Sequence, residues 1–301
     1  MQNSVYRIRE VIAHLPIRPI PRGELWLGTE FLNRAGFADI LENHFRLCDQ
    51  LGQDIICLPI ADNPDGKPAL GYRYFNYTDL KAATHIRDRF VTAVLDGPFQ
   101  ELVNRMGLMV VLTTWIRKRK EIISAYEIEQ AKVLELTRRC LDQGVHALVI
   151  ADDFAADKAP FISPTDIDIL CTSFYTQAVT AIHTANASAF LHSCGNLTLL
   201  IPLIKAWRLD GLAAVQHRAI DLTALHQAFD SKLTIMAGIE ADLLKSDFPP
   251  PGPLNEFKRI VGTLAPLGGL ILSSCCGLYS GDFLARIKKI YAIADHITTN
   301  E

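Results

Sequence analysis

Residues 189–196 read AFLHSCGN, and this stretch joins a short apolar run to two soft metal ligands and a turn. The apolar run has the length of a buried strand, and the Gly-Asn pair after it predicts that the chain turns there. Residues 268–278 read GGLILSSCCGL and repeat this order, because an apolar run again leads into cysteines. Imidazole and thiolate both bind Zn²⁺, so the two stretches predict one zinc site if the fold brings their ends together.

The composition is that of a soluble protein with a large core. The chain has 301 residues, of which 49% are hydrophobic, and its formal net charge is −3. That charge gives no reason to expect a nucleic acid or an anionic membrane as partner. The seven cysteines are an odd number scattered through a long chain, unlike a secreted disulfide framework. Arg7, Arg9 and Glu10 interrupt any apolar leader, and no apolar run is long enough for a membrane helix. We therefore expect a cytoplasmic protein with reduced thiols.

Apolar runs of strand length recur along the whole chain and alternate with helical patterns. Runs bounded by helices are typical of a parallel sheet that is buried on both faces. Eight such units in a chain of this length predict an α/β fold, a single (β/α)8 barrel of the TIM type over residues 1–301. The expected strands cover residues 24–27, 54–60, 90–95, 146–151, 189–192, 209–215, 233–238 and 270–273.

Two segments outside these strands also carry a structural signal. Residues 1–22 predict a short helix and then an extended N-terminal segment, because prolines end the helix. Residues 99–144 have a helical pattern, in which Ser124 and Glu127 have the spacing of a capping box. Within it, residues 108–112 fit either a strand or a buried helix.

The polar and metal-capable residues of the chain follow the expected strands. Active sites of α/β barrels lie at the C-terminal ends of the strands. The candidate residues there are Asp152 and Asp153, His192 and Cys194, Gln216, Glu240, and Cys275 or Cys276. The alternative is that His192 and these cysteines only fill the core, as we expect for Cys48, Cys57, Cys140 and Cys171.

A ligand set of one imidazole and two thiolates favours a particular chemistry. Two thiolates cancel the charge of Zn²⁺, and an incoming thiol can still lose its proton to the site and bind the ion as a thiolate. An all-histidine site, which is more positive, would polarise water instead. The residues at the strand ends therefore predict alkyl transfer to a thiol rather than hydrolysis.

At these residues the sequence resembles the superfamily of uroporphyrinogen decarboxylase, the methylcobamide:coenzyme M methyltransferases and the cobalamin-independent methionine synthases. The resemblance covers nearly the whole chain and is best over residues 144–295. It rests on IADDF at 150–154, FISP at 161–164, FLHSCGN at 190–196, GGLILS at 268–273 and CGL at 276–278. The resemblance implies a barrel in which His192, Cys194 and Cys276, rather than Cys275, bind zinc and a thiol completes the coordination.

The chain departs from the family pattern at two places. Where the zinc methyltransferases supply a glutamate, this chain has Gln216, which leaves water, Gln216 or Glu240 as the resting fourth ligand. The decarboxylase has an N-terminal arginine motif for the porphyrinogen carboxylates, and here residues 32–37 read LNRAGF. A substrate with many carboxylates needs several cations, so decarboxylation is the less favoured activity.

We therefore expect a zinc-dependent methyltransferase that moves a methyl group between a corrinoid, such as methylcobalamin, and a small thiol-type acceptor. The chain has no Asp-x-His-x-x-Gly cobalamin motif, so the corrinoid would arrive on a partner protein. Asp152 or Asp153 would orient His192 or accept the thiol proton. The alternatives are a cofactor-free decarboxylase of the uroporphyrinogen type, with Asp54 or Asp62 as the acid, and a non-catalytic barrel that binds a corrinoid protein.

Overall fold

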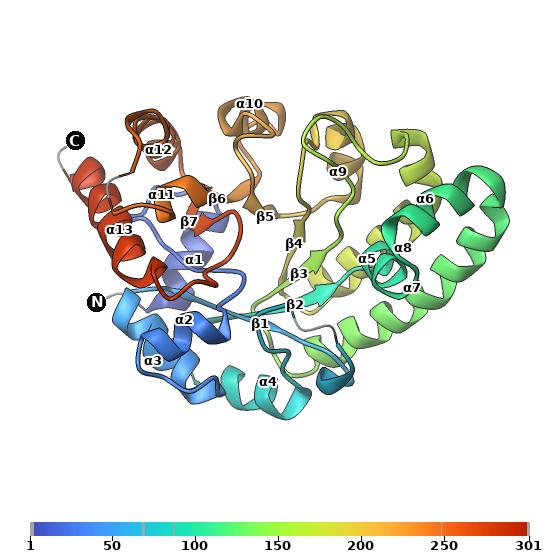
Figure 1. Cartoon of the computed structure of the whole chain (residues 1–301), viewed down its shortest axis with the longest axis horizontal. Helices are drawn as coiled ribbons and strands as arrows, with labels where there is room; N and C mark the ends of the chain where they lie inside the picture. Colours follow the sequence, from blue (N-terminus) through green and yellow to red (C-terminus); the bar gives the residue numbers. More distant parts are fainter. Residues whose placement is uncertain (1–2, 68–69, 87, 248, 300–301) are drawn as a thin grey trace.

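Seven strands, β1 to β7, form a single parallel sheet in which each strand pairs with its neighbours in the sequence. A computed structural model describes residues 3–67, 70–86, 88–247 and 249–299. The sheet curls, and the helices lie around its outer side (Figure 1). The strands are β1 Ile55–Pro59, β2 Phe90–Asp96, β3 Ala147–Ala151, β4 Ser188–His192, β5 Gly211–Val215, β6 Thr234–Ile239 and β7 Leu270–Ser274. This is the curled α/β architecture of the TIM type, and each of these strands lies in an expected apolar run.

Helices after β1 connect the strands and cover the outer face of the sheet, and three further helices, α1 to α3, precede β1. They are α1 Ser4–Ile12, α2 Thr29–Arg34, α3 Leu41–Leu51, α4 Tyr77–Thr84, α5 Pro98–Met106, α6 Leu108–Arg117, α7 Arg119–Leu141, α8 Pro164–Thr184, α9 Ile201–Trp207, α10 Leu222–Ala228, α11 Ala241–Leu244, α12 Pro251–Leu264 and α13 Phe283–Thr299. The ambiguous run 108–112 belongs to α6. Ser124 and Glu127 lie inside α7, so the predicted capping box there is wrong. None of the helices in the described part of the chain combines the length and apolar character that crossing a membrane requires.

The expected first strand, residues 24–27, is not a regular strand, and this corrects the prediction of eight. Residues 21–23, just before it, nevertheless form backbone hydrogen bonds with both edges of the sheet. Gly23 N donates to Leu272 O on β7 (3.1 Å), and Leu272 N donates to Pro21 O (2.9 Å). On the other side, Asp54 N donates to Arg22 O (2.7 Å), next to β1. Proline has no N–H to donate, so a segment that carries Pro19 and Pro21 cannot continue a ladder of backbone bonds.

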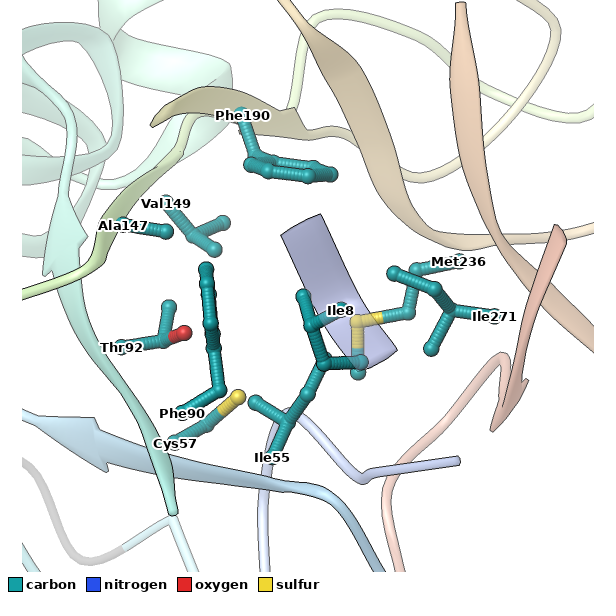
Figure 2. A pocket seen from close by; sticks show the side chains of 10 residues that line it. All are labelled: Ile8, Ile55, Cys57, Phe90, Thr92, Ala147, Val149, Phe190, Met236 and Ile271. Carbon is teal, nitrogen blue, oxygen red and sulfur yellow. The ribbon is translucent and has the colours of Figure 1, made fainter. Parts of the chain in front are cut away.

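The lumen of the curled sheet is closed at its N-terminal end by α1. Ile8 of α1 points between Ile55, Phe190 and Met236, as Figure 2 shows. The remaining void is about 10 Å³, which is no more than the space of one water molecule, and its lining is almost wholly apolar. No ligand of useful size fits in this void, whereas the polar and metal-capable candidates from the sequence lie at the opposite, C-terminal end of the strands.

A buried carboxylate ties the N-terminal segment to β7. Glu24 is 2% exposed; its Oε2 accepts from Ser274 N (2.9 Å) and Oε1 accepts from Tyr291 OH (2.9 Å). Gln53 Nε2 donates to the same Tyr291 oxygen at 3.1 Å. Burial raises the pKa of Glu24 from its usual 4.5 to about 7, although the bonds from Ser274, Tyr291 and Ser273 oppose the shift. The carboxyl therefore binds its proton more tightly in the folded chain than in the unfolded chain.

This pKa shift predicts a pH-dependent stability. Since the folded pKa is raised, the contribution of Glu24 is fully present below pH 4.5 and is lost as pH rises through about 7. Relative to Glu24→Gln, which cannot titrate, the unaltered protein should lose about 3 kcal/mol of unfolding free energy over this interval. Urea unfolding of both proteins across this range measures the difference; parallel pH profiles would show that Glu24 titrates normally.

Candidate metal centre at the C-terminal ends of the strands

His192 is the last residue of β4 and is held in one orientation and one tautomer. Its side chain is 5% exposed, and its Nδ1 lies 2.9 Å from Ala213 O on β5. A carbonyl oxygen only accepts, so Nδ1 carries the proton and the lone pair of Nε2 is available to a cation. A register shift between Ala213 and Val215 leaves Ala214 as an extra residue at φ 52°. Such bulges redirect backbone groups, and this one adjoins the carbonyl that fixes His192.

Residues 192–195, the His192–Gly195 turn, are anchored by hydrogen bonds from both sides. Ser193 Oγ accepts from Phe154 N (2.9 Å), and Cys194 N donates to Asp153 Oδ1 (2.7 Å). Gly195 N donates to Gln216 Oε1 at 2.9 Å. The side-chain amide of Gln216, which the sequence suggested as one possible fourth zinc ligand, therefore positions the turn. Together these bonds fix where the Cys194 thiol points.

Asp153, His192 and Cys194 bring three potential ligand atoms within 4.8 Å of one another. His192 Nε2 lies 3.7 Å from Cys194 Sγ and 3.7 Å from Asp153 Oδ1. Neighbouring ligand atoms around a tetrahedral zinc ion are about 3.3–3.6 Å apart, given the usual zinc–ligand bond lengths. These two spacings differ from those values by only a few tenths of an ångström, so the pairs that His192 makes with Cys194 and with Asp153 are compatible with zinc. Asp153 was expected as a catalytic residue, and here it is also a possible ligand.

The electrostatics of Cys194 agree with a site that needs a cation. Burial and, after it, the charges of Asp153, Cys276 and Asp157 together raise the pKa of its thiol to about 12. A metal ion reverses this balance because it favours the thiolate directly.

The expected ligand Cys276 follows β7 at the same end of the sheet. Its Sγ is not among the three atoms that lie within 4.8 Å of one another, and it makes a 3.5 Å contact with Gly277 O. Cys276 is nevertheless near enough to Cys194 for its charge to raise the pKa of the Cys194 thiol. Cys275, the alternative at this position, donates instead to Glu240 Oε2 at 3.0 Å.

Asp152 is turned away from the metal group. Its carboxylate is fully buried, accepting from Gln100 N (2.7 Å) with Oδ1 and from Tyr175 OH (3.0 Å) with Oδ2. Gln100 lies in the first turn of α5, so the carboxylate binds that helix end. A Cβ at Gly97 would come within 2.1 Å of the Asp152 carboxyl carbon, so the site requires glycine there. Of the two aspartates that follow β3, Asp153 is the one whose carboxylate lies near the His192 ring.

Aromatic side chains that the sequence analysis did not single out pack beside His192. The Trp26 ring meets the His192 ring edge-on, with centroids 4.7 Å apart. Tyr72 packs against both Trp26 (6.0 Å) and Tyr279 (6.1 Å). These rings come from segments distant in sequence, so no local sequence pattern predicts their contact.

Comparison with known proteins identifies the fold. No family model and no curated protein matches this chain. Among solved structures, a methyltransferase from Methanosarcina mazei is 15% identical, with a TM-score of 0.72 over 99% of this chain and 100% of that one. A putative vitamin-B12 independent methionine synthase from Listeria monocytogenes is 11% identical (TM-score 0.55; 94% and 98% covered). A sugar phosphate isomerase/epimerase from Parabacteroides distasonis is 12% identical (TM-score 0.54; 92% and 97% covered). At these identities the likeness shows a shared fold.

Gly195 provides a test of how tightly the His192–Gly195 turn is packed. Its φ is 82°, and an added Cβ would lie 2.5 Å from the carbonyl oxygens of Ala155 and Ala156. Gly144 has a similar φ of 77° but open space around it, so it is the matched control. We expect Gly144→Ala to cost about 1 kcal/mol of unfolding free energy and Gly195→Ala about 3 kcal/mol or more. Equal losses in urea unfolding would mean that the turn has room to shift.

Proposed function

We propose that this chain is a zinc-dependent methyltransferase that moves a methyl group between a corrinoid on a partner protein and a thiol-type acceptor. The observation that carries the proposal is the pair of His192 Nε2 and Cys194 Sγ, 3.7 Å apart, with Nδ1 fixed on Ala213. In this proposal residues 21–28 act as the irregular eighth strand of a (β/α)8 barrel and complete its C-terminal rim.

The proposed ligands come from the ends of two strands that are distant in sequence. His192 and Cys194 would hold zinc from β4, and Cys276 from the segment after β7. Zinc bound there would lower the pKa of an acceptor thiol, so that the thiol is a nucleophilic thiolate at neutral pH. Gln216 would keep Cys194 in place through Gly195 N rather than bind the metal.

Asp153 is the residue that we assign to proton transfer. Its side chain is 41% exposed and lies 3.7 Å from His192 Nε2, so it reaches both the metal group and solvent. It would accept the proton that the acceptor thiol releases and pass it to water. If Asp153 binds the metal before the acceptor arrives, the acceptor thiol would displace the carboxylate. The exposure of the Asp153 side chain is consistent with such a replaceable ligand.

The wall formed by Trp26, Tyr72 and Tyr279 supports a reaction that excludes water. Trp26 covers one edge of His192, and the tyrosines extend the aromatic surface from there. A methyl group that moves between cobalt and sulfur carries no hydrogen-bonding atom, so an apolar wall suits it. Two of the structures with this fold are named as a methyltransferase and a methionine synthase, which supports methyl transfer in general.

The arrangement favours this activity over decarboxylation. Asp54, one expected acid, precedes β1 at the closed end of the sheet and pairs with Arg7 Nε at 2.8 Å. Asp62, the other, accepts from Tyr77 OH (2.6 Å) and pairs with Arg139 (2.6 Å). Both carboxylates are engaged in contacts that do not involve His192.

The activity is tested with purified protein, methylcobalamin and a panel of small thiols. The unaltered protein should contain zinc at the His192 site and speed the loss of methylcobalamin absorbance, whereas His192→Ala and Cys194→Ala should each lose the zinc of this site and the activity. Asp153→Asn should retain zinc and lower the rate by roughly 100-fold.

The matched control is Cys171→Ala, because Cys171 is a buried cysteine on α8 that the proposal does not use. A zinc content that His192→Ala leaves unchanged would refute the ligand assignment. Stoichiometric zinc without turnover of any thiol would instead favour the non-catalytic barrel that binds a corrinoid protein.

A further inference from the structure

A chain of hydrogen bonds leads from the aromatic wall to a carboxylate at the end of β2. Tyr72 OH lies 3.1 Å from Tyr74 OH, and Tyr74 OH donates to Asp96 Oδ2 at 3.0 Å. Lys67 Nζ donates to the same Asp96 oxygen at 2.8 Å. Because the one hydroxyl proton of Tyr74 points to Asp96, the Tyr74 oxygen accepts from Tyr72. The proton of Tyr72 is thereby used within the protein, and its oxygen remains as an acceptor for a donor group.

The Tyr72 hydroxyl is close to the metal group. Burial, and after it the charges of Asp96 and Asp153, raises the pKa of this hydroxyl to about 12. Its bond with Tyr74 and the nearby Trp26 indole oppose the shift. The hydroxyl is therefore neutral at physiological pH, and it lies near enough to Asp153 to feel that carboxylate. No hydrogen bond of normal length and angle joins Trp26 to Tyr72 in the described part of the chain, so the oxygen can accept from a further donor.

The charged groups around the wall give this region a negative charge. Lys67 pairs with both Asp96 and Glu101, and one ammonium with two carboxylates leaves a net charge of −1. Asp153 adds a further negative charge, since its ion pair among the described residues is with His192 and not with a lysine or arginine. A thiol that carries a carboxylate would therefore be repelled here, whereas a cation would be attracted.

One ammonium is already held in this region by an aromatic ring and a carboxylate. Lys67 Nζ lies 5.3 Å from the centroid of the Tyr74 ring while it donates to the carboxylate at the end of β2. An ammonium within about 6 Å of a ring centroid is attracted by the face of the ring. Trp26 and Tyr72 have centroids 6.0 Å apart and rings tilted by 33°, and both side chains are half-buried. The wall thus offers a second cation a ring face and an oxygen acceptor.

We propose that the methyl acceptor is an aminothiol without a carboxylate, and that its ammonium binds to the Tyr72 oxygen and to the ring faces of the aromatic wall. The negative charges of Asp153 and of the Lys67 ion pairs attract this ammonium. Since the Trp26 and His192 ring centroids are 4.7 Å apart, a short carbon linker between nitrogen and sulfur spans the distance from the wall to the metal group. This inference rests on the proposed function, because it names the chemical class of its thiol substrate.

Binding of S-methyl derivatives tests the inference without an activity assay. S-methylcysteamine, methylthioethanol and (methylthio)acetate are similar in length, differ in charge and have no thiol proton to lose. Calorimetry with the zinc-loaded protein at neutral pH should show that the amine binds roughly 10-fold more tightly than the alcohol. The carboxylate should bind more weakly than the amine, because of the negative charges around the wall. An amine that binds no more tightly than the alcohol would overturn the inference.

Tyr72→Phe removes the acceptor oxygen and keeps the ring. It should lower the affinity for S-methylcysteamine roughly 10-fold and the affinity for methylthioethanol by less, because hydrogen bonds to charged groups are the stronger ones. Tyr77→Phe is the matched control, because the Tyr77 hydroxyl also donates to a carboxylate, Asp62 Oδ1 at 2.6 Å, but lies on α4. It should retain the preference for the amine. Equal losses for both compounds in Tyr72→Phe would contradict recognition of the ammonium by this oxygen.

Turnover distinguishes this inference from the proposed function. In the methylcobalamin assay, kcat/KM for cysteamine should exceed that for mercaptoethanol and for mercaptoacetate by roughly 10-fold, and Tyr72→Phe should narrow the difference. Faster turnover of mercaptoacetate would refute the inference and leave the proposed methyltransferase intact. If no thiol is methylated while S-methylcysteamine still binds preferentially, the proposed function fails and the cation site remains.

Discussion

The bond between His192 Nδ1 and the carbonyl of Ala213 is the interaction on which the candidate site depends. It joins β4 to β5, and it decides that the lone pair of the ring is on Nε2, the atom that faces Cys194 and Asp153. With the opposite tautomer, Nε2 would carry a proton and repel a cation. The bulge at Ala214 lies next to the Ala213 carbonyl, the acceptor on one side of the ring. On the other side, the anchored His192–Gly195 turn holds the backbone of Cys194 in place.

The distribution of apolar and polar residues explains why chemistry collects at one end of the sheet. α1 fills the N-terminal end of the lumen with Ile8 and its neighbours, and the void left there is too small for a ligand. At the other end, carboxylates and thiols lie close together with few basic partners: the half-exposed Asp153 with Cys194, and the buried Glu240 with Cys275. Groups of one charge that share a buried region require protons or metal ions to coexist. The strand ends therefore have the electrostatic character of a metal-binding region.

The sequence predicted those parts of the molecule that depend on local patterns. Each regular strand overlaps an apolar run, and Ser163-Pro164, a sequence typical of a helix start, begins α8, with Ser163 Oγ accepting from Asp166 N. His192 and Cys194 could be placed at a strand end because the run before them is apolar and the Gly-Asn pair ends it. The segment at 24–27 has an apolar pattern too, but prolines just before it and the buried Glu24 give it an irregular path between β7 and β1.

Features that depend on contacts between distant segments could not be predicted. Asp152 and Asp153 are adjacent acids, and only the fold sends one to the α5 end and the other to His192. Gln216 and His217 are likewise adjacent, and only the turn after β5 decides which of them faces Gly195 and which faces Glu240. Ser124 and Glu127 have the spacing of a helix start, yet α7 continues through them because its buried face extends on both sides.

Anomalous diffraction at the zinc absorption edge, from crystals of the zinc-loaded protein, tests the central claim most directly. The account predicts a peak about 2.0–2.1 Å from His192 Nε2 and about 2.3 Å from Cys194 Sγ, with Cys276 as a further ligand. A zinc-loaded crystal with no peak bonded to His192 Nε2 would contradict the account, because the ring would then be positioned for something other than a metal.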